Sequence, residues 1–359
     1  MKRILCLIDF LGAGGAQRQL VGLATFLKDK GYDVTVACYQ ESGFYVDQLL
    51  SKGVSYVFLD KATRSSFRIW HVARFIRKIK PDVVISYLGT PSICACVAHL
   101  FNHRFQLLVS ERNTTQHTGL NERLRFNLFR TADYVIPNAY AQEDYINKVF
   151  PFLSNKVVTI PNFVDLQYFS PPLKRQRRHV PEIIIVSTIR DSKNTLTLID
   201  AVAQLKTDGA HFHISWYGKE DFHIEYINQC QHKMDQLGVS DCIELKDKTS
   251  AIHEKYQEAD YFCLPSFYEG TPNVICEAMA SGLPVACSDV CDNSRYVVEG
   301  VNGSLFDPHD PTTIFEAIRR LLSLSNVEYE NYCDNSRQRA ESMLSKERFV
   351  ESYIKLFDS

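Results

Sequence analysis

The sequence lacks the patterns of membrane-spanning and disulfide-stabilised proteins. No apolar run among its 359 residues approaches the roughly 20 residues needed to cross a bilayer. The basic start, Met1 to Arg3, leads into a short apolar run that meets Asp9. We therefore expect a buried first strand there and not a signal peptide. The eleven cysteines, an odd number without C-x-x-C spacing, favour a reducing cytoplasm as the location.

Metal-binding and nucleic-acid-binding patterns are also missing. The eleven histidines follow no metal-ligand spacing, and no Asp-x-Asp pair follows an expected strand. We therefore expect no metal and no cofactor. No known nucleic-acid reading motif is present, so nucleic acid is not an expected partner.

The two halves of the chain carry opposite net charge, because acidic residues are fewer than basic ones in the first half and basic residues are fewer than acidic ones in the second. Residues 1–160 hold 20 Lys and Arg against 12 Asp and Glu, whereas residues 161–359 hold 20 against 30. Much of the positive excess falls between Arg64 and Lys80, where basic residues alternate with Phe67, Trp70 and Phe75. Such a helix can lie on an anionic membrane surface, but it can equally pack on its own sheet with a basic solvent face.

The order of apolar runs predicts a parallel α/β fold. Strand-like and helical patterns alternate, and the rhythm restarts after a basic, proline-containing segment at 171–178 that we interpret as a linker. We expect two domains, 1–165 and 166–340, and a closing helical stretch over 328–359. The expected strands are Ile4–Phe10, Val34–Cys38, Val54–Leu59, Val83–Tyr87, Gln106–Ser110, Tyr134–Ile136, Val157–Ile160, Ile183–Thr188, His213–Tyr217, Ile243–Leu245, Tyr261–Leu264 and Val285–Ser288.

The segment from Tyr268 to Val285 carries the most specific pattern. Two carboxylates, Glu269 and Glu277, stand eight residues apart across an expected loop-to-helix junction. Thr271 suits the N-cap, Pro272 the first helical position and Gly282 the end of the helix. The amides of Gly270, Thr271 and Asn273 would then lie at the positive end of the helix dipole, where hydroxyl or phosphate oxygens bind. Glu277 could accept hydrogen bonds from a vicinal diol.

Two further loops follow expected strands. Gly12 to Arg18 follows the first strand, and its glycines would let backbone amides approach an anion at a helix start. It is not a dinucleotide fingerprint, because the third glycine would fall at Gln17. In the second domain the strand from Ile183 is followed by Arg190 and Lys193. Their charges could neutralise a diphosphate leaving group without a metal, although a solvent-exposed basic loop is the alternative.

The Glu269, seven-residue, Glu277 spacing, followed by Glu-Ala-Met-Ala-Ser-Gly-Leu-Pro-Val, resembles the large retaining glycosyltransferase family 4. The resemblance covers nearly the whole chain. It implies the GT-B fold, in which two Rossmann-like, doubly wound parallel-sheet domains face a cleft. The last helix of such enzymes packs back on the N-terminal domain, which implies the same for residues 328–359.

The resemblance also implies roles for particular residues. Arg190 and Lys193 would stabilise the departing diphosphate, Glu269 and its neighbouring amides would orient the sugar, and Glu277 would hold the ribose hydroxyls. The catalytic prediction is therefore Arg190, Lys193 and Glu269, and the donor-binding prediction is Gly14, Gly15, Gly270, Thr271, Asn273 and Glu277.

The chain departs from the family pattern in several loops. The stretch between Arg190 and Lys193 is shortened, Trp216 to Lys219 holds one glycine where two are common, and Leu245 to Asp247 lacks the usual glycine. In many relatives a histidine ends a strand near the reacting centre. Here the corresponding strand ends in Ser110-Glu111-Arg112-Asn113, and His117 follows. The acceptor-side candidates are Arg18, Glu111, Arg112 and His117.

The sequence thus favours a cytoplasmic, metal-independent, retaining glycosyltransferase that uses a nucleoside diphosphate sugar. A UDP-sugar is favoured as donor, a lipid-linked saccharide is the expected acceptor, and peripheral contact with an anionic membrane is an open expectation. A GT-B-fold sugar-nucleotide epimerase and a non-catalytic nucleotide-sugar binding module are the alternatives.

Overall fold

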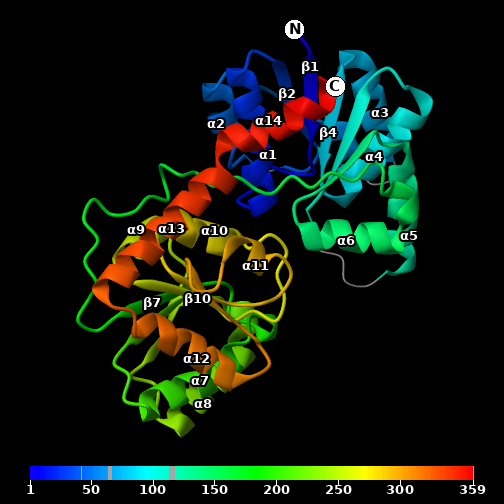
Figure 1. Cartoon of the computed structure of the whole chain (residues 1–359). Helices are drawn as coiled ribbons and strands as arrows, with labels where there is room; N and C mark the ends of the chain where they lie inside the picture. Colours follow the sequence, from blue (N-terminus) through cyan, green and yellow to red (C-terminus); the bar gives the residue numbers. More distant parts are fainter. Residues whose placement is uncertain (42, 64–66, 113–117, 359) are drawn as a thin grey trace. The chain divides into compact units, whose positions relative to one another are not determined.

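The computed structural model describes residues 1–41, 43–63, 67–112 and 118–358. They form two compact units. The N-terminal unit holds Met1–Phe163 and Lys346–Ser359, and the C-terminal unit holds Val164–Ser345. Each unit is a six-stranded parallel sheet with helices on both faces (Figure 1). The first unit thus ends two residues before the expected boundary at 165.

The N-terminal unit has the strand order β3-β2-β1-β4-β5-β6. Its strands are β1 (Arg3–Leu7), β2 (Asp33–Cys38), β3 (Ser55–Phe58), β4 (Val83–Tyr87), β5 (Gln106–Glu111) and β6 (Tyr134–Pro137). Its longer helices are α1 (Gly15–Asp29), α2 (Val46–Ser51), α3 (Arg68–Ile79), α4 (Gly89–Phe101), α5 (Leu120–Leu128), α6 (Tyr140–Val149) and α14 (Lys346–Phe357). Three-residue 3-10 turns lie at Asp60–Ala62, Phe129–Thr131 and Pro151–Leu153.

The central strands of this sheet are buried on both sides, which explains their continuous apolar sequences. Ile4 and Cys6 of β1 pack with α1, α2 and α14. Leu5 and Leu7 pack with α3 and α4 on the other face. The period of two along one strand therefore divides the core into two layers.

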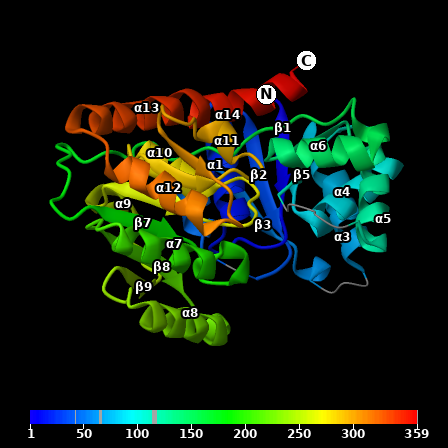
Figure 2. The ribbon, with the colours of Figure 1, turned by 60° about the horizontal axis from the view of Figure 1, so that its bottom comes forward.

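The C-terminal unit repeats the same topology, with the order β12-β11-β10-β7-β8-β9. Its strands are β7 (Glu182–Val186), β8 (His213–Lys219), β9 (Ile243–Asp247), β10 (Tyr261–Leu264), β11 (Val285–Ser288) and β12 (Gly303–Phe306). Its helices are α7 (Thr195–Thr207), α8 (Ile224–Leu237), α9 (Ile252–Glu258), α10 (Asn273–Ala280), α11 (Asn293–Tyr296), α12 (Pro311–Leu322) and α13 (Asn326–Leu344), with 3-10 turns at Asp191–Lys193 and Asp221–His223. Helices α7, α8 and α12 cover one face, and α9, α10 and α13 cover the other (Figure 2).

One strand prediction was wrong, and one strand was missed. Residues 157–160 run beside β6, but only Val157 forms a bridge, to Val135. The sequence analysis missed β12, whose four residues, Gly-Ser-Leu-Phe, form no long apolar run. Gly303 is needed there because a Cβ at this position would lie 2.0 Å from the Val285 carbonyl oxygen.

The expected closing helix over 328–359 is two helices. Helix α13 begins with a Ser325–Glu328 capping box and packs on α10 within the C-terminal unit. The extended backbone of Ser345 ends it. Helix α14 belongs to the N-terminal unit and packs against α1, whereas α13 belongs to the C-terminal unit, so the expected single helix is divided between the two units.

The basic segment at 171–178 is not a free linker. The Arg175 guanidinium donates to the carbonyls of Ala259 and Ser281, the C-caps of α9 and α10. Arg177 donates to the carbonyls of Leu322 and Leu324 at the end of α12. Each arginine thus satisfies orphan carbonyls and places positive charge at the negative end of a helix dipole.

Candidate functional site

The carboxyl edge of the C-terminal sheet gathers the predicted catalytic residues. The turn Asp191–Lys193 follows β7, and the loop that leads from β10 to α10 carries Glu269. The Phe267 N–H donates to the Ser192 carbonyl at 3.1 Å and so joins the two loops. In open α/β sheets this edge is where ligands bind.

Lys193 and Glu269 form an ion pair in this edge. The Lys193 Nζ lies 2.5 Å from the Glu269 Oε1, and the two side chains are 14% and 12% exposed. The sequence analysis placed both residues at one site, and the structure brings them into contact. Arg190 begins the same turn and is exposed, and no charged partner of its side chain is seen among the described residues.

Glu277 lies inside α10, four residues after the helix begins at Asn273. Its side chain is buried, and the Tyr256 hydroxyl is 3.4 Å from its Oε2. The helix ends in a Schellman motif: the Gly282 N–H donates to Met279 and the Leu283 N–H to Ala278. The φ of +72° at Gly282 confirms that this glycine ends the helix.

The start of α10 differs from the prediction. Pro272, not Thr271, is the N-cap, and the helix begins at Asn273. The Asn273 N–H donates to the Thr271 carbonyl at 2.8 Å, so this amide is not the open donor that we expected. A proline at φ −78° and ψ 71° produces this tight turn, which moves the helix start by one residue. Gly270 and Thr271 remain in the loop that precedes it.

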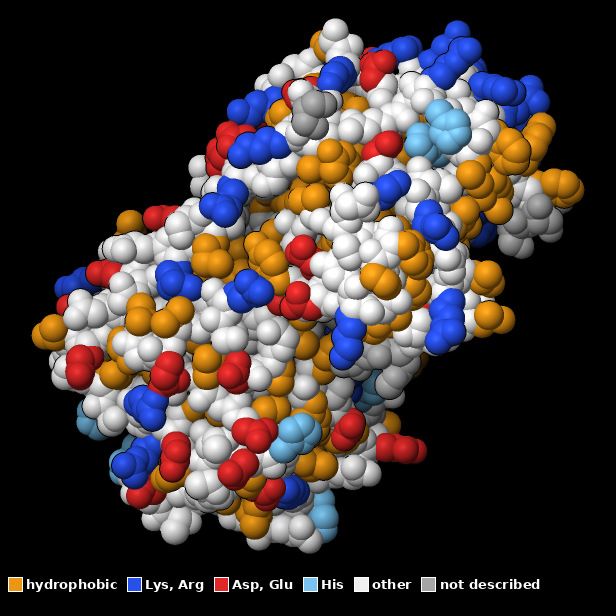
Figure 3. Space-filling view, turned by 45° about the vertical axis from the view of Figure 1, so that its right-hand side comes forward, with side chains coloured by type: hydrophobic (Ala, Val, Ile, Leu, Met, Phe, Trp, Pro, Cys, Tyr) orange, Lys and Arg blue, Asp and Glu red, His pale blue; other side chains and the backbone are white. Residues whose placement is uncertain are grey.

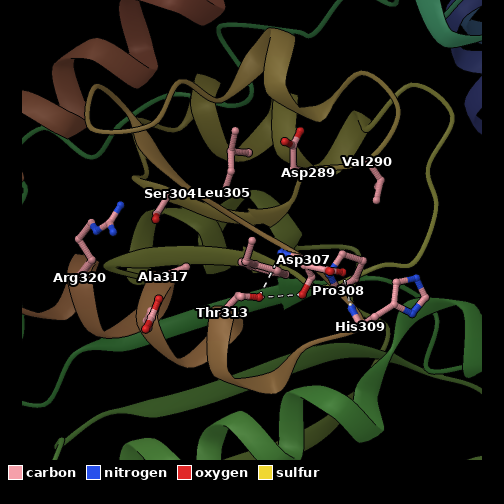
Figure 4. Close-up of a pocket in the computed structure, with 12 residues that line it drawn as sticks. Asp289, Val290, Ser304, Leu305, Asp307, Pro308, His309, Thr313, Ala317 and Arg320 are labelled. Atoms are coloured by element: carbon pink, nitrogen blue, oxygen red, sulfur yellow. Dashed lines mark hydrogen bonds between the residues drawn. The ribbon is translucent and has the colours of Figure 1, made fainter.

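An open hollow of about 570 Å³ lies at the carboxyl ends of β11 and β12. Asp289, Asp307 and His309 line it, and the Thr313 hydroxyl is bonded to the backbone of Asp307 (Figure 4). The His309 ring stacks on Phe267 at 4.8 Å. The hollow therefore adjoins the loop that carries Glu269.

The corresponding edge of the N-terminal sheet holds the predicted residues Gly14, Gly15, Arg18, Glu111 and Arg112. Gly14 is the N-cap of α1 and Gly15 is its first residue, as the glycine loop predicts. A Cβ on Gly14 would lie 2.3 Å from the Gln17 Oε1, so this position has no room for a larger residue without a shift of Gln17. Arg18 lies in the first turn of α1, half-buried.

Two acceptor-side candidates are engaged inside the N-terminal unit. Glu111 is 2% exposed and pairs with Arg125 of α5 at 3.1 Å. Arg112 donates to the Ser110 hydroxyl at 2.7 Å and to the Asn162 side-chain oxygen at 2.6 Å.

The same arginine also joins β4 to α14. It donates to the hydroxyls of Tyr87 and Tyr353 at 2.6 and 2.8 Å, and these two hydroxyls lie 3.0 Å apart. Burial opposes the charge of Arg112, but the facing Tyr353 and Tyr87 outweigh it and raise the pKa of the guanidinium. Burial also raises the pKa of Tyr87. The geometry gives Arg112 a structural role. His117 lies outside the described residues.

A basic and aromatic surface covers α3 and α4 of the N-terminal unit. A groove of about 380 Å³ runs between them, lined by Trp70, Arg74, Arg77 and Phe101 among others. Trp70 is 55% exposed and Phe101 81%. Figure 3 shows basic and hydrophobic side chains side by side on this unit, at the upper right. We call this the α3–α4 surface.

Helix α3 packs on its own sheet and also keeps an exposed basic and aromatic face. Val72 and Ile76 are buried against the sheet, as an ordinary packed helix requires. Phe67, Ile69 and Trp70 remain exposed beside the basic residues. Arg64 lies outside the described residues. Within the described part of the chain, no helix has the length and apolar character of a membrane span, and no group of three possible metal ligands is found.

Sequence reasoning missed the partners that fix these edges. The sequence analysis assigned no role to Asn194, Arg125 or Tyr353. An asparagine directly before an apolar helix is an N-cap signal, so Asn194 could have been noticed. The other two lie on helices whose packing the local pattern does not specify.

The two parallel-sheet units have the GT-B fold. The structure is similar to a glycosyltransferase from Rickettsia africae, with a TM-score of 0.87 and 17% identity over 99% of this chain and 97% of that one. It is also similar to Anabaena HepE in complex with UDP and glucose, with a TM-score of 0.83 and 17% identity over the whole of both chains.

The sequence profile described as Glycosyltransferase Family 4 matches residues 13–168, and the one described as Glycosyl transferases group 1 matches residues 180–324. The chain belongs to this glycosyltransferase family and is a transferase of class EC 2.4. It is 21% identical over 344 residues, 90% of each chain, to the N-acetylgalactosamine-N,N'-diacetylbacillosaminyl-diphospho-undecaprenol 4-alpha-N-acetylgalactosaminyltransferase of Campylobacter jejuni. It is 23% identical over 323 residues, 85% of this chain and 88% of the relative, to the amylovoran biosynthesis glycosyltransferase AmsD of Erwinia amylovora.

Proposed function

We propose that this enzyme moves a hexose or an N-acetylhexosamine from a nucleoside diphosphate sugar to a lipid-linked saccharide in bacterial surface polysaccharide synthesis, with retention at the anomeric carbon. The observation that carries the proposal is the Lys193–Glu269 pair at the carboxyl edge of the C-terminal sheet. Glu277, buried in the helix that follows the Glu269 loop, supports it. The names of the Campylobacter and Erwinia relatives support the acceptor class and the pathway. The UDP bound to the similar Anabaena structure supports a UDP-sugar.

The leaving group determines what the edge must do. When the bond between the anomeric carbon and the diphosphate breaks, negative charge builds on the phosphate oxygens. Lys193 and the exposed Arg190 stabilise this charge, so the diphosphate competes with Glu269 for the Lys193 ammonium. Glu269 is then available to the sugar hydroxyls, and Glu277 accepts hydrogen bonds from the ribose.

Retention follows if the acceptor attacks the anomeric carbon from the same face as the one from which the leaving group departs. The acceptor oxygen forms a bond to the anomeric carbon of an oxocarbenium-like ion pair, and its proton passes to the departing phosphate oxygen. No enzymic nucleophile is needed, so positioning and charge stabilisation supply the rate enhancement. Two cationic side chains supply the charge, and we propose that neither a metal nor a cofactor takes part.

The composition of the α3–α4 surface supports an acceptor that is held at the membrane. Exposed Trp70 and Phe101 beside Arg74 and Arg77 fit the interface of an anionic bilayer, where aromatic rings bury and guanidinium groups meet headgroups. We propose that the enzyme is cytoplasmic and docks on the inner face of the cell membrane through this surface.

A coupled donor and acceptor assay tests the proposal. Thermal shift with a panel of sugar nucleotides identifies the donor, and mass spectrometry then follows sugar transfer to diphospho-undecaprenol-linked saccharides. We expect transfer in EDTA and an α-linked product from an α-linked donor by NMR. Interconversion of the donor sugar without an acceptor would instead identify an epimerase, and loss of activity in EDTA with recovery in manganese would contradict metal independence.

A further inference from the structure

Asn194 lies at the meeting point of three loops on the carboxyl edge of the C-terminal sheet. It is 1% exposed, and its backbone is left-handed, with φ 61°. Its side-chain Nδ2 donates to the Pro265 carbonyl at 3.0 Å and to the Pro308 carbonyl at 2.6 Å. Because an amide nitrogen carries two hydrogens, this one side chain joins the loops after β7, β10 and β12.

The loops that Asn194 joins carry the residues of the proposed chemistry. Lys193 is its immediate neighbour, and Glu269 lies four residues beyond Pro265. The Phe267 N–H donates to the Ser192 carbonyl between these points. The loops that carry Lys193 and Glu269 are therefore joined by two ties, one through the Asn194 side chain and one through the Ser192 carbonyl.

We propose that Asn194 is a positioning residue for glycosyl transfer: it fixes the separation of Lys193 and Glu269 without touching the substrate. The inference rests on the proposed function of that edge. A lysine side chain is a flexible four-carbon stem, so its ammonium reaches a developing charge reliably only if the backbone of the lysine is held in place. A catalytic group displaced by about 1 Å can cost on the order of 100-fold in rate.

Substitutions can separate the side-chain tie from the backbone conformation. Glycine adopts the left-handed backbone without strain but has no side-chain amide, so Asn194→Gly removes the buried side chain and its two hydrogen bonds while the backbone conformation remains accessible. Aspartate keeps the size of the side chain but cannot donate when ionised, so Asn194→Asp places carboxylate oxygens against two carbonyl oxygens.

A matched control lies at the opposite edge of the same sheet. Asn302 is also buried and bridges two backbone groups: its side chain accepts from the Val298 N–H at 2.8 Å and donates to the Tyr296 carbonyl at 3.3 Å. Asn302→Ala should therefore lower stability as a buried amide loss does, without altering the carboxyl edge.

The first test is a comparison of kinetic constants at a temperature where all variants are folded. For Asn194→Gly we expect kcat to fall on the order of 10- to 100-fold while the donor KM changes little. Asn194→Asp should fall at least as far, and Asn302→Ala should keep both constants. Equal kcat values for the wild type and a folded Asn194→Gly would overturn the inference, whereas an inactive wild type would contradict the proposed function instead.

The second test needs no activity. An amine-reactive reagent with peptide mass spectrometry measures the modification rate of Lys193 in the ligand-free protein, with the exposed Lys206 as internal reference. Both Asn194 variants should raise the Lys193 rate severalfold by loosening its pair with Glu269, and Asn302→Ala should not. An unchanged Lys193 rate in both Asn194 variants would overturn the positioning role even if transfer activity is never found.

Discussion

The two units share one strand order but differ in the polar residues at their carboxyl edges. In the N-terminal unit Glu111 pairs with Arg125, and Arg112 is bonded to four side chains. In the C-terminal unit Lys193 and Glu269 form a partly buried pair with each other, and Arg190 beside them is exposed. Equal topology therefore does not give equal chemistry. The helices packed behind an edge decide whether its charges hold the fold together or meet a ligand.

The largest effect is expected from a substitution that removes a charge from the carboxyl edge of the C-terminal unit. Lys193→Ala should lower kcat by 100-fold or more, because loss of one charge-stabilising contact costs about 2.7 to 4 kcal/mol by analogy with oxyanion donors. Circular dichroism and thermal unfolding should show a folded protein. Steady-state transfer kinetics provide the measurement.

Lys206→Ala is the matched control for this substitution. Lys206 also pairs with a carboxylate, Asp241, at 2.6 Å, but on the exposed surface of the same unit. Transfer should be unchanged in this variant. Near wild-type turnover in a folded Lys193→Ala protein would remove the leaving-group role from this edge.

The second prediction breaks the N-terminal edge. Arg112→Ala leaves Tyr87 and Tyr353 without their charged partner, so we expect a loss of about 3 kcal/mol in the stability of this unit. Arg112→Lys should recover little of it, because an ammonium cannot satisfy four acceptors spread around a planar fork. Hydrogen exchange with mass spectrometry resolves the two units and so measures the change locally.

The control for Arg112 is Arg104→Ala, which removes an exposed arginine from the same unit. It should not change exchange anywhere. If Arg112→Ala leaves exchange in β4, β5 and α14 unchanged but abolishes transfer, Arg112 belongs to the acceptor site, and the contrast between the two edges is wrong.

The two edges also show how much of the structure can be predicted from the sequence. Both sheets and eleven of the twelve strands follow from the period of the apolar runs and from turn residues. The edge rule and the family resemblance together place Lys193 and Glu269 at one site, but the sequence did not predict that they pair. Boundaries shift by a few residues, as at β1, which ends at Leu7 and not Phe10.

The failures share one physical cause, which is dependence on distant residues. Arg112 gained a structural role from Tyr353, 241 residues away. The basic segment at 171–178 became a set of helix caps because three helix ends lie near it. The short strand β12 exists because β11 offers an edge, not because its own sequence favours extension. Local patterns do not contain such partners.

The charge contrast between the units gives the third prediction. Arg74→Glu with Arg77→Glu on the α3–α4 surface should reduce binding to anionic liposomes by roughly 30-fold at low salt, since each basic residue near such a surface contributes about 1 kcal/mol. Co-sedimentation at low and high ionic strength measures it, and wild-type binding should weaken with salt. The double variant Lys30→Glu with Lys52→Glu changes charge equally elsewhere on the unit and should bind as wild type does. No wild-type binding at low salt would favour a soluble acceptor.

The fourth prediction separates the two glutamates of the C-terminal edge. Glu277→Ala should weaken the binding of free UDP by about 10- to 100-fold, the value of a hydrogen bond to a charged group at about 1.5 to 3 kcal/mol. Glu269→Ala should leave UDP binding nearly unchanged but lower kcat with the full donor. Calorimetry with UDP decides between them, and equal weakening by both substitutions would refute this division of roles.

The smallest expected effect concerns cysteine reactivity, which also differs between the units. The four cysteines of the N-terminal unit are buried, whereas Cys291 of the C-terminal unit is exposed, in the loop beside Glu269. Burial of its thiol nevertheless raises the pKa of Cys291. Because only the thiolate reacts, its alkylation by iodoacetamide should be slow at pH 7 and should still rise beyond pH 9, with no plateau near pH 8.

Nucleotide binding turns this thiol into a reporter of the proposed site. The backbone of Glu269 contributes to the environment of the Cys291 thiol, so a ligand that engages this loop should change its access. We expect UDP to slow alkylation severalfold, as measured by peptide mass spectrometry, with Cys291→Ser to assign the labelled peptide and glucose alone as the unprotected control. Protection by UDP in the wild type that persists in Glu277→Ala would show that the nucleotide is held without the ribose contact. An unchanged rate under saturating UDP would place the nucleotide away from this edge. The C-terminal edge would then no longer differ from the N-terminal one as a ligand site, and the proposed function would lose its main support.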